Sequence, residues 1–250
     1  MRRVAALYDI HCNLPALDAV LADVDACDVD LIVIGGDVVS GPLPVETIGR
    51  LMGLGGSVRF VMGNADREVV EAFDRGPRPE ELASDEFVVR MAAFAASRID
   101  TRGRDFLAGF EPAVVVAVDG LGSVRFCHGS PRSDTESLTP LTPDPRLRDV
   151  LSGFSEEVVV CGHTHRQFVL SVDGQRVVNA GSVGLPYEGR AGAYWALLGP
   201  DVSLRRTEYD LAQALEQMRR GGWADLDELL AESLLEPADP DEVSRFFEAG

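Results

Sequence analysis

Three short apolar runs in the first quarter of the chain alternate with stretches of helical spacing. The runs cover residues 3–8, 31–34 and 58–61, and they stop at Asp9, at Gly35-Gly36-Asp37 and at Gly63-Asn64. Residues 14–26 and 44–54, which lie between the runs, place apolar side chains at helical intervals. This alternation predicts βαβ units and a largely parallel sheet, in which ligands bind beyond the carboxyl ends of the strands.

The pattern changes after a helical stretch at residues 80–110. Strand-rich runs follow at 113–118, 123–127, 157–161, 167–172, 175–179, 193–198 and 202–207, and they predict a second sheet. Residues 129–145 are rich in Ser, Thr and Pro and predict a substrate loop. We expect one domain over residues 1–250, with a sandwich at 1–208 and helices at 209–250 packed on it; packing of these helices on a partner is the alternative.

Charge and composition exclude several classes of protein. The formal net charge of −18 argues against general nucleic-acid binding and against an anionic membrane surface as partner. All 23 basic residues are Arg, so the lysine chemistry of Schiff-base enzymes, Walker A NTPases and protein kinases is excluded. The first apolar run ends at Asp9, too short for a signal peptide, and no run is long enough for a transmembrane helix, which predicts a cytoplasmic protein. Cys12, Cys27, Cys127 and Cys161 lack C-x-x-C spacing and are expected to be reduced.

All four histidines lie in compact polar or glycine-flanked clusters. They are His11, His128, His163 and His165, and Asp9, Asp37 and Asn64 add two carboxylates and a carboxamide at loop positions. Oxygen and imidazole ligands suit Mn, Fe, Zn, Ni or Co, whereas a structural zinc site usually has four ligands rich in Cys. Two such ions about 3.5 to 4 Å apart need a shared carboxylate, for which Asp37 is the natural choice. A hydroxide between two ions could attack phosphorus, which predicts phosphoester hydrolysis.

The order of these motifs resembles the calcineurin-like metallophosphoesterase superfamily. The similarity rests on D-x-H at 9–11, G-D at 36–37, G-N at 63–64, the lone His128 and G-H-T-H at 162–165, and it spans residues 4–199. Within the superfamily the chain is similar to small bacterial and archaeal phosphodiesterases that are grouped with diadenosine tetraphosphatases. The resemblance implies an α/β fold, a four-layer α/β/β/α sandwich with the metals at the edge between its two sheets.

The resemblance also implies a ligand set for each of two divalent metal ions. One ion would take Asp9, His11, Asp37 and His165, and the other would take Asp37, Asn64, His128 and His163. Asn13 would support the ligands from behind, and the native metal, manganese among the candidates, stays open.

The chain departs from the family pattern at two positions. Ala65 stands where many members have a His that can protonate the leaving group, which favours diesters or anhydrides over monoesters. Asp66 or metal-bound water would partly replace that acid. Cys12 stands where the family usually has Gly, so it must adopt the backbone angle that Gly supplied. A redox role for its thiol is the alternative to a buried apolar side chain.

Arginines near the motifs are candidates for binding substrate in so acidic a chain. Arg67 and Arg132 come first, because they follow Asn64 and His128 closely, whereas Arg166 and Arg190 are further candidates. We expect a dinuclear metal-dependent phosphodiesterase acting on a small or nucleotide-like phosphodiester or anhydride. A phosphomonoesterase, including a protein serine/threonine phosphatase, and a non-catalytic metal-binding scaffold are the alternatives, and assembly into a homo-oligomer stays open.

Overall fold

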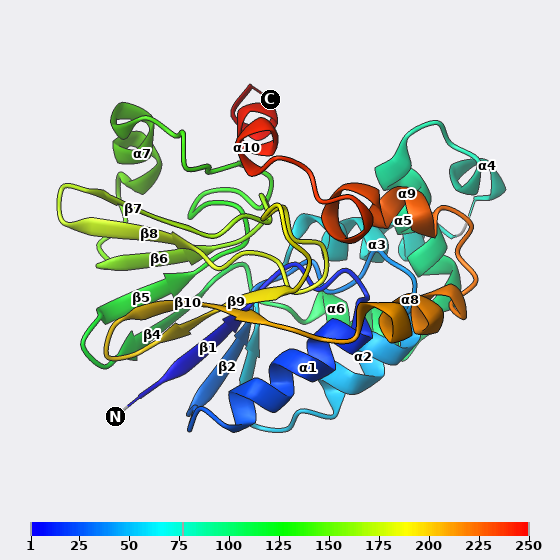
Figure 1. Ribbon diagram of the computed structural model, residues 1–250, viewed down its shortest axis with the longest axis horizontal. Coiled ribbons are helices and arrows are strands. Elements are labelled where there is room, and N and C mark those ends of the chain that lie inside the picture. Colours follow the sequence, from blue (N-terminus) through cyan, green and yellow to red (C-terminus); the bar gives the residue numbers. More distant parts are fainter. Residues whose placement is uncertain (1, 77, 250) are drawn as a thin grey trace.

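Two five-stranded sheets face each other at the centre of the molecule. The computed structural model describes residues 2–76 and 78–249. Figure 1 shows the two sheets with most helices covering one outer face and α7 (Asp144–Leu151) on the opposite side. The order of layers is therefore α/β/β/α, as expected.

The first sheet has the strand order β10-β9-β1-β2-β3. Its parallel part consists of β1 (Val4–Leu7), β2 (Leu31–Ile34) and β3 (Val58–Phe60). The strands β9 (Ala193–Leu198) and β10 (Val202–Thr207) complete it, and β9 pairs antiparallel with β1. The prediction that residues 193–198 and 202–207 belong to the second sheet was wrong, because the chain crosses back to the first sheet after β8.

The second sheet has the order β4-β5-β6-β8-β7. Its strands are β4 (Val114–Val118), β5 (Gly122–Phe126), β6 (Val158–Cys161), β7 (Phe168–Val172) and β8 (Gln175–Asn179). Strands β5, β6 and β8 run parallel to one another. Both sheets therefore bring the carboxyl ends of several parallel strands to one edge, where ligands commonly bind.

Alternation along the strands builds the apolar core on both faces of the first sheet. On β1, Val4 and Ala6 face the second sheet, where they meet Val124 and Phe126, whereas Ala5 and Leu7 face the helices. The helices on this side are α1 (Leu14–Asp25), α2 (Pro44–Met52), α3 (Asn64–Arg75), α5 (Phe87–Arg98) and α6 (Thr101–Ala108). The short helix α4 (Pro79–Leu82) contacts α5 and buries none of its residues. The helices α3 and α7 were not predicted from the sequence. The helical stretch predicted at 80–110 forms three helices, α4, α5 and α6.

The C-terminal segment is helical as predicted. It forms α8 (Leu211–Arg219), α9 (Leu226–Leu230), the π-helix η1 (Ala231–Leu235) and α10 (Pro240–Ala249). Met218, Trp223 and Leu230 belong to the same apolar cluster as residues of α1. Among the residues described, no helix has the length and apolarity that a membrane span requires.

The last helix, α10, is attached mainly through polar contacts. Glu248 accepts hydrogen bonds from Thr139 and Thr142 and forms an ion pair with Arg146, at 2.7, 2.9 and 2.8 Å. Arg166 donates to the carbonyl of Pro240 at 2.6 Å. In Figure 1 α10 lies at the top of the view, above the loops that leave the two sheets.

Candidate metal centre

The candidate ligands lie directly beyond the parallel strands, all in loops except Asn64, which is the first residue of α3. Asp9 follows β1, Asp37 follows β2, Asn64 follows β3, His128 follows β5, and His163 and His165 follow β6. The residues Asp9, His11, Asp37, His163 and His165 all have left-handed backbone angles, with φ between 46° and 66°. Such angles are uncommon outside glycine and cluster at functional sites, where the surrounding structure holds them in place.

Two glycines let the loops approach each other closely. A Cβ on Gly63 would lie 2.2 Å from Asp37 Oδ1, and one on Gly162 would lie 2.3 Å from Asp9 Oδ2. Both distances are far below van der Waals contact. The glycines at these two positions therefore leave the space that the two carboxylates occupy.

Two groups of three side chains lie within reach of a single ion each. Asp9, His11 and His165 form one group, and Asp37, His128 and His163 form the other. Within each group the potential ligand atoms lie within 4.8 Å of one another. The ligand sets that the resemblance implies contain these two groups and add Asp37 to the first and Asn64 to the second, and the full sets stay predictions.

Two carboxylate oxygens lie between the two groups, each close to histidines of both. Asp37 Oδ2 lies 3.7 Å from His11 Nε2 and 3.4 Å from His128 Nε2, so it faces both groups. Asp9 Oδ1 likewise lies 3.4 Å from His165 Nε2 and 3.8 Å from His128 Nε2. The position of Asp37 Oδ2 suits the bridging role expected for Asp37.

Backbone carbonyls fix the orientation of three imidazole rings. His11 Nδ1 lies 3.3 Å from the carbonyl of Ser40, and His128 Nδ1 lies 2.9 Å from that of Gly35. His165 Nδ1 lies 2.8 Å from the carbonyl of Leu185. Each contact directs Nε2 toward the carboxylates, and a ring held in this way presents an electron pair to a metal ion.

The donor set fits divalent cations. Asp9 Oδ1, Asn64 Oδ1 and His128 Nε2 are buried and have no hydrogen-bond partner, which is costly unless another group satisfies them. Burial lowers the pKa of His128, but the carboxylates of Asp37 and Asp9 outweigh it and raise that pKa to about 10. Burial and the neighbouring His128 lower the pKa of His163 to about 4. The carboxylates thus attract positive charge, and the neutral imidazole of His163 beside them can act as a ligand.

Backbone N–H groups surround the carboxylate of Asp66. Its side chain is fully buried, and both carboxylate oxygens accept hydrogen bonds from backbone N–H groups. The donors are Asp37 at 2.8 Å, Val38 at 2.9 Å, and Val39 and Gly63 at 3.2 Å. Burial and the nearby Asp37 raise the pKa of Asp66 to about 7. Four donors already occupy the carboxylate, an arrangement that favours a role in holding the Asp37 loop in shape, and the general-acid role of Asp66 stays a prediction.

Asn13 supports the site through the backbone rather than through a ligand side chain. Its amide donates to the carbonyl of Gly184 at 3.0 Å and to the hydroxyl of Tyr209 at 3.2 Å. Its carbonyl accepts from Ala16 at 3.2 Å, which caps the N-terminus of α1. Asn13 therefore ties the loop after His11 to the loop that follows β8.

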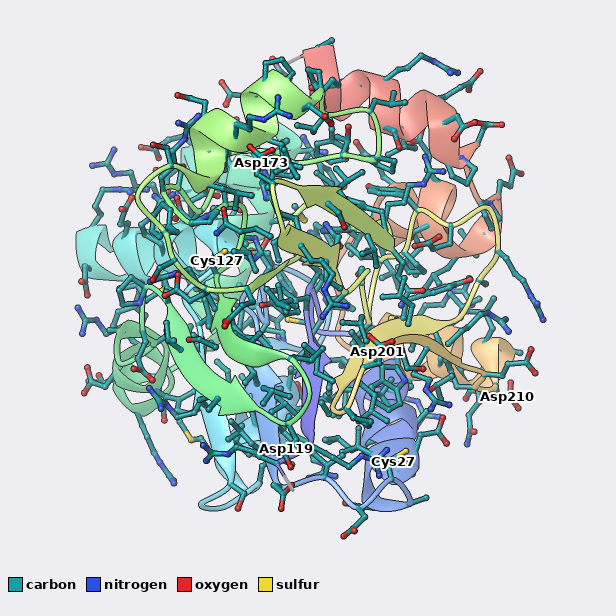
Figure 2. All side chains as sticks on the ribbon, turned by 90° about the vertical axis from the view of Figure 1, so that its left-hand side faces the viewer. Cys27, Asp119, Cys127, Asp173, Asp201 and Asp210 are labelled. Carbon is teal, nitrogen blue, oxygen red and sulfur yellow. The ribbon has the colours of Figure 1, made fainter. Side chains whose placement is uncertain are left out.

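The cysteines near the ligands are buried thiols. Cys12 has a left-handed backbone with φ of 56°, the conformation expected at this position from the Gly that it replaces. Burial raises the pKa of Cys12 and Cys161 above the ordinary thiol value and that of Cys127 to about 12. None of the four cysteines forms a disulfide, and Figure 2 labels Cys27 and Cys127 in separate parts of the molecule. The thiols of Cys12, Cys127 and Cys161 therefore stay protonated, which favours an apolar packing role.

Arg67 and Arg132 line one cavity together with His128. The cavity has a volume of about 400 Å³ and is also lined by Ser130. Arg67 forms an ion pair with Asp134 at 2.8 Å, and Arg132 pairs with Glu136 and Asp149 at 2.7 and 2.8 Å. An anionic substrate would compete with these carboxylates for the guanidinium groups.

The two further candidate arginines, Arg166 and Arg190, lie outside the cavity beside His128. Arg166 contacts α10, as described above, and forms an ion pair with Asp241 at 2.9 Å. Arg190 forms an exposed ion pair with Glu208 at 2.8 Å.

Two aromatic residues beside the site were missed in the sequence. The ring of Tyr187 stacks on His165 with centroids 5.3 Å apart, and Phe247 of α10 meets His163 edge-on at 6.2 Å. Neither residue belongs to a motif, and Phe247 lies 84 positions after His163 in the sequence. Only the folded chain brings these rings to the ligands.

Known proteins share the fold of this chain. A crystal structure of a metallophosphoesterase from Sphaerobacter thermophilus is 29% identical, with a TM-score of 0.69 over 92% of this chain and 98% of that one. A hypothetical protein from Pyrococcus horikoshii shares the fold, with 20% identity and a TM-score of 0.77 over 93% of this chain and 97% of that one. An uncharacterized protein of Methanocaldococcus jannaschii is 27% identical over 236 residues, which cover 86% of this chain and 91% of that protein.

The fold and the two ligand groups define a metal-dependent phosphoester hydrolase. The chain belongs to the calcineurin-like phosphoesterase superfamily, whose domain model matches residues 2–198. The matched region contains every candidate ligand but ends before α8 (Leu211–Arg219). The C-terminal helices, with Phe247 against His163, therefore lie outside the matched region.

Proposed function

We propose that this protein is a dinuclear phosphodiesterase that hydrolyses a small or nucleotide-like phosphodiester or anhydride. The observation that carries the proposal is the pair of carboxylate oxygens, Asp37 Oδ2 and Asp9 Oδ1, that each face both groups of histidines. Two bound divalent ions would supply an activated water and would neutralise the charge that develops on the phosphoryl oxygens.

The ligands would be divided between the two ions as the resemblance implies. Asp9, His11, Asp37 and His165 would hold one ion, and Asp37 with Asn64, His128 and His163 would hold the other. The unpartnered oxygen of Asn64 and the unpartnered nitrogen of His128 support this assignment.

Substrate would enter where Arg67 and Arg132 line the cavity beside His128. Their guanidinium groups would orient an anionic phosphoryl group by charge-assisted hydrogen bonds. The acidic partners Asp134 and Glu136 hold these guanidinium groups in place before substrate binds.

The preference for a diester or anhydride rests on Ala65. This residue is almost fully buried, and its backbone N–H donates to Asp37 Oδ1 at 2.8 Å, so the position is part of the ligand loop but carries no acid. The carboxylate of the neighbouring Asp66 accepts hydrogen bonds from backbone N–H groups on both oxygens. Without a general acid, the reaction favours substrates whose leaving group needs no proton.

Hydrolysis of bis(p-nitrophenyl) phosphate beside p-nitrophenyl phosphate tests the proposal. We expect metal-dependent cleavage that favours the diester, and we expect Ala65→His to shift the preference toward the monoester. Circular dichroism and metal content verify that this variant is folded and loaded. Preference of the wild type for the monoester would overturn the proposed substrate class, and two bound metals without any hydrolysis would favour the scaffold alternative. Manganese as the native metal, a cytoplasmic location and homo-oligomer formation stay predictions.

A further inference from the structure

A second cavity adjoins the metal-ligand groups on the side of α10. Its volume is about 350 Å³, and it is lined by Tyr187, Glu232, Ala238, Glu242, Val243, Phe246 and Phe247. Tyr187 and Phe247 form its inner wall, because their rings contact His165 and His163. An ester group of a substrate held at the metal centre would therefore extend into this cavity.

Three aromatic rings face this space from two separate segments. The centroids of Tyr187 and Phe247 lie 6.4 Å apart, and those of Phe246 and Phe247 lie 5.7 Å apart. Phe246 is 75% exposed, the largest exposure among the large apolar side chains described as exposed. An exposed ring at the rim of a cavity can stack on a ligand or present its negative face to a cation.

Charge distinguishes this cavity from the one beside His128. Glu232 and Glu242 line it, neither has an ion-pair partner among the described residues, and no arginine is among its lining residues. The cavity beside His128, in contrast, is lined by Arg67 and Arg132. The two sides of the site would therefore select groups of opposite charge.

We infer that the aromatic cavity binds a positively charged organic group, an alkylammonium carried by one ester arm of the phosphodiester. Aromatic faces together with unpaired carboxylates are the environment that a quaternary or tertiary ammonium prefers, since it combines an apolar surface with charge. The inference deepens the proposed function by naming the class of substrate, and it rests on that function only for catalysis, since binding of the ammonium is a separate event.

Two isosteric diesters test this inference. p-Nitrophenyl phosphocholine carries the ammonium, and p-nitrophenyl 3,3-dimethylbutyl phosphate replaces its nitrogen by carbon. In both, water adds to phosphorus and the bond to p-nitrophenolate breaks, so only the charge of the retained arm differs. At low ionic strength we expect kcat/KM for the choline ester to exceed that for the neutral ester about tenfold.

Substitutions of the two glutamates assign the preference to the cavity. In Glu232→Gln/Glu242→Gln we expect the ratio of kcat/KM between the choline ester and the neutral ester to fall to within about twofold of unity. The control Glu80→Gln/Glu236→Gln removes the same charge at exposed positions outside the cavity, and we expect it to keep the wild-type ratio. Equal kcat/KM for the two esters in the wild type, or the same ratio in both double variants, would overturn the inference. Failure to cleave any diester would instead count against the proposed function.

Binding without turnover separates the two proposals. Saturation-transfer NMR of metal-free protein with tetramethylammonium reads contact between the cation and the aromatic rings, and we expect the signal in the wild type and its loss in Glu232→Gln/Glu242→Gln. No signal in the wild type would overturn the inference whatever the enzyme hydrolyses. A change from dimer to monomer in Phe246→Ser, with the ester preference unchanged, would assign this face to a second copy of the chain and would likewise overturn it.

Discussion

Replacing Asp66 by Asn tests how the Asp37 loop is held. The carboxylate accepts four backbone hydrogen bonds, two on each oxygen, from Asp37, Val38, Val39 and Gly63. An amide keeps one accepting oxygen and replaces the other by an NH₂ group, so two backbone donors lose their partner. Above the pKa of about 7, where the Asp66 carboxylate is ionised, each hydrogen bond to the charged group contributes about 1.5 to 3 kcal/mol, so the loss is about 3 to 6 kcal/mol.

Relief of the repulsion between Asp66 and Asp37 offsets part of this loss. We therefore expect the free energy of unfolding to fall by about 2 to 4 kcal/mol and the affinity for Mn²⁺ to fall roughly tenfold or more, because the shifted loop carries Asp37. Urea denaturation of metal-free protein and calorimetric titration with Mn²⁺ measure the two effects. Asp85→Asn, at an exposed position away from the site, serves as the matched control and should stay within about 0.5 kcal/mol. Unchanged stability and metal affinity together with a large loss of kcat would refute this reasoning and restore Asp66 as a general acid.

Four further substitutions probe the surroundings of the site. Gly63→Ala places a Cβ 2.2 Å from Asp37 Oδ1, so we expect affinity for Mn²⁺ to fall at least about tenfold in a calorimetric titration; wild-type affinity would show that the loops do not need this close approach. Arg132→Ala, and likewise Arg67→Ala, should raise KM roughly three- to tenfold at unchanged metal content, whereas wild-type kinetics would mean that these arginines only form ion pairs. Cys12→Gly should be inactivated by peroxide at the wild-type rate, because the thiol is buried and protonated; slower inactivation would restore the redox role.

The positions of the ligands could be predicted because they depend on local patterns. Asp9, Asp37 and Asn64 follow apolar runs that form parallel strands, and the carboxyl ends of parallel strands meet at one edge by geometry alone. The backbone conformation of Cys12 followed from its place in the motif. Such features need only a few neighbouring residues, which the sequence supplies.

Features that depend on distant parts of the chain could not be predicted in this way. Apolar alternation in residues 193–198 marks a strand but does not say which sheet it joins, and its pairing with β1 links positions almost 200 residues apart. The hydrogen bonds of Asp66 arise from the turn after β2, so its position beside Asn64 suggested chemistry instead. Phe247 reaches His163 only because α10 folds back over the site.

The number of metal ions bound per chain tests the central claim most directly. Metal-stripped protein is equilibrated with Mn²⁺, separated from free metal and analysed by mass spectrometry, beside Asp37→Asn and the control Asp85→Asn. We predict two ions per chain for the wild type and the control, and fewer than one for Asp37→Asn at the same free concentration, because Asp37 Oδ2 faces both groups of ligands. A single ion in the wild type, or two ions retained in Asp37→Asn, would contradict the account of a dinuclear centre bridged by Asp37.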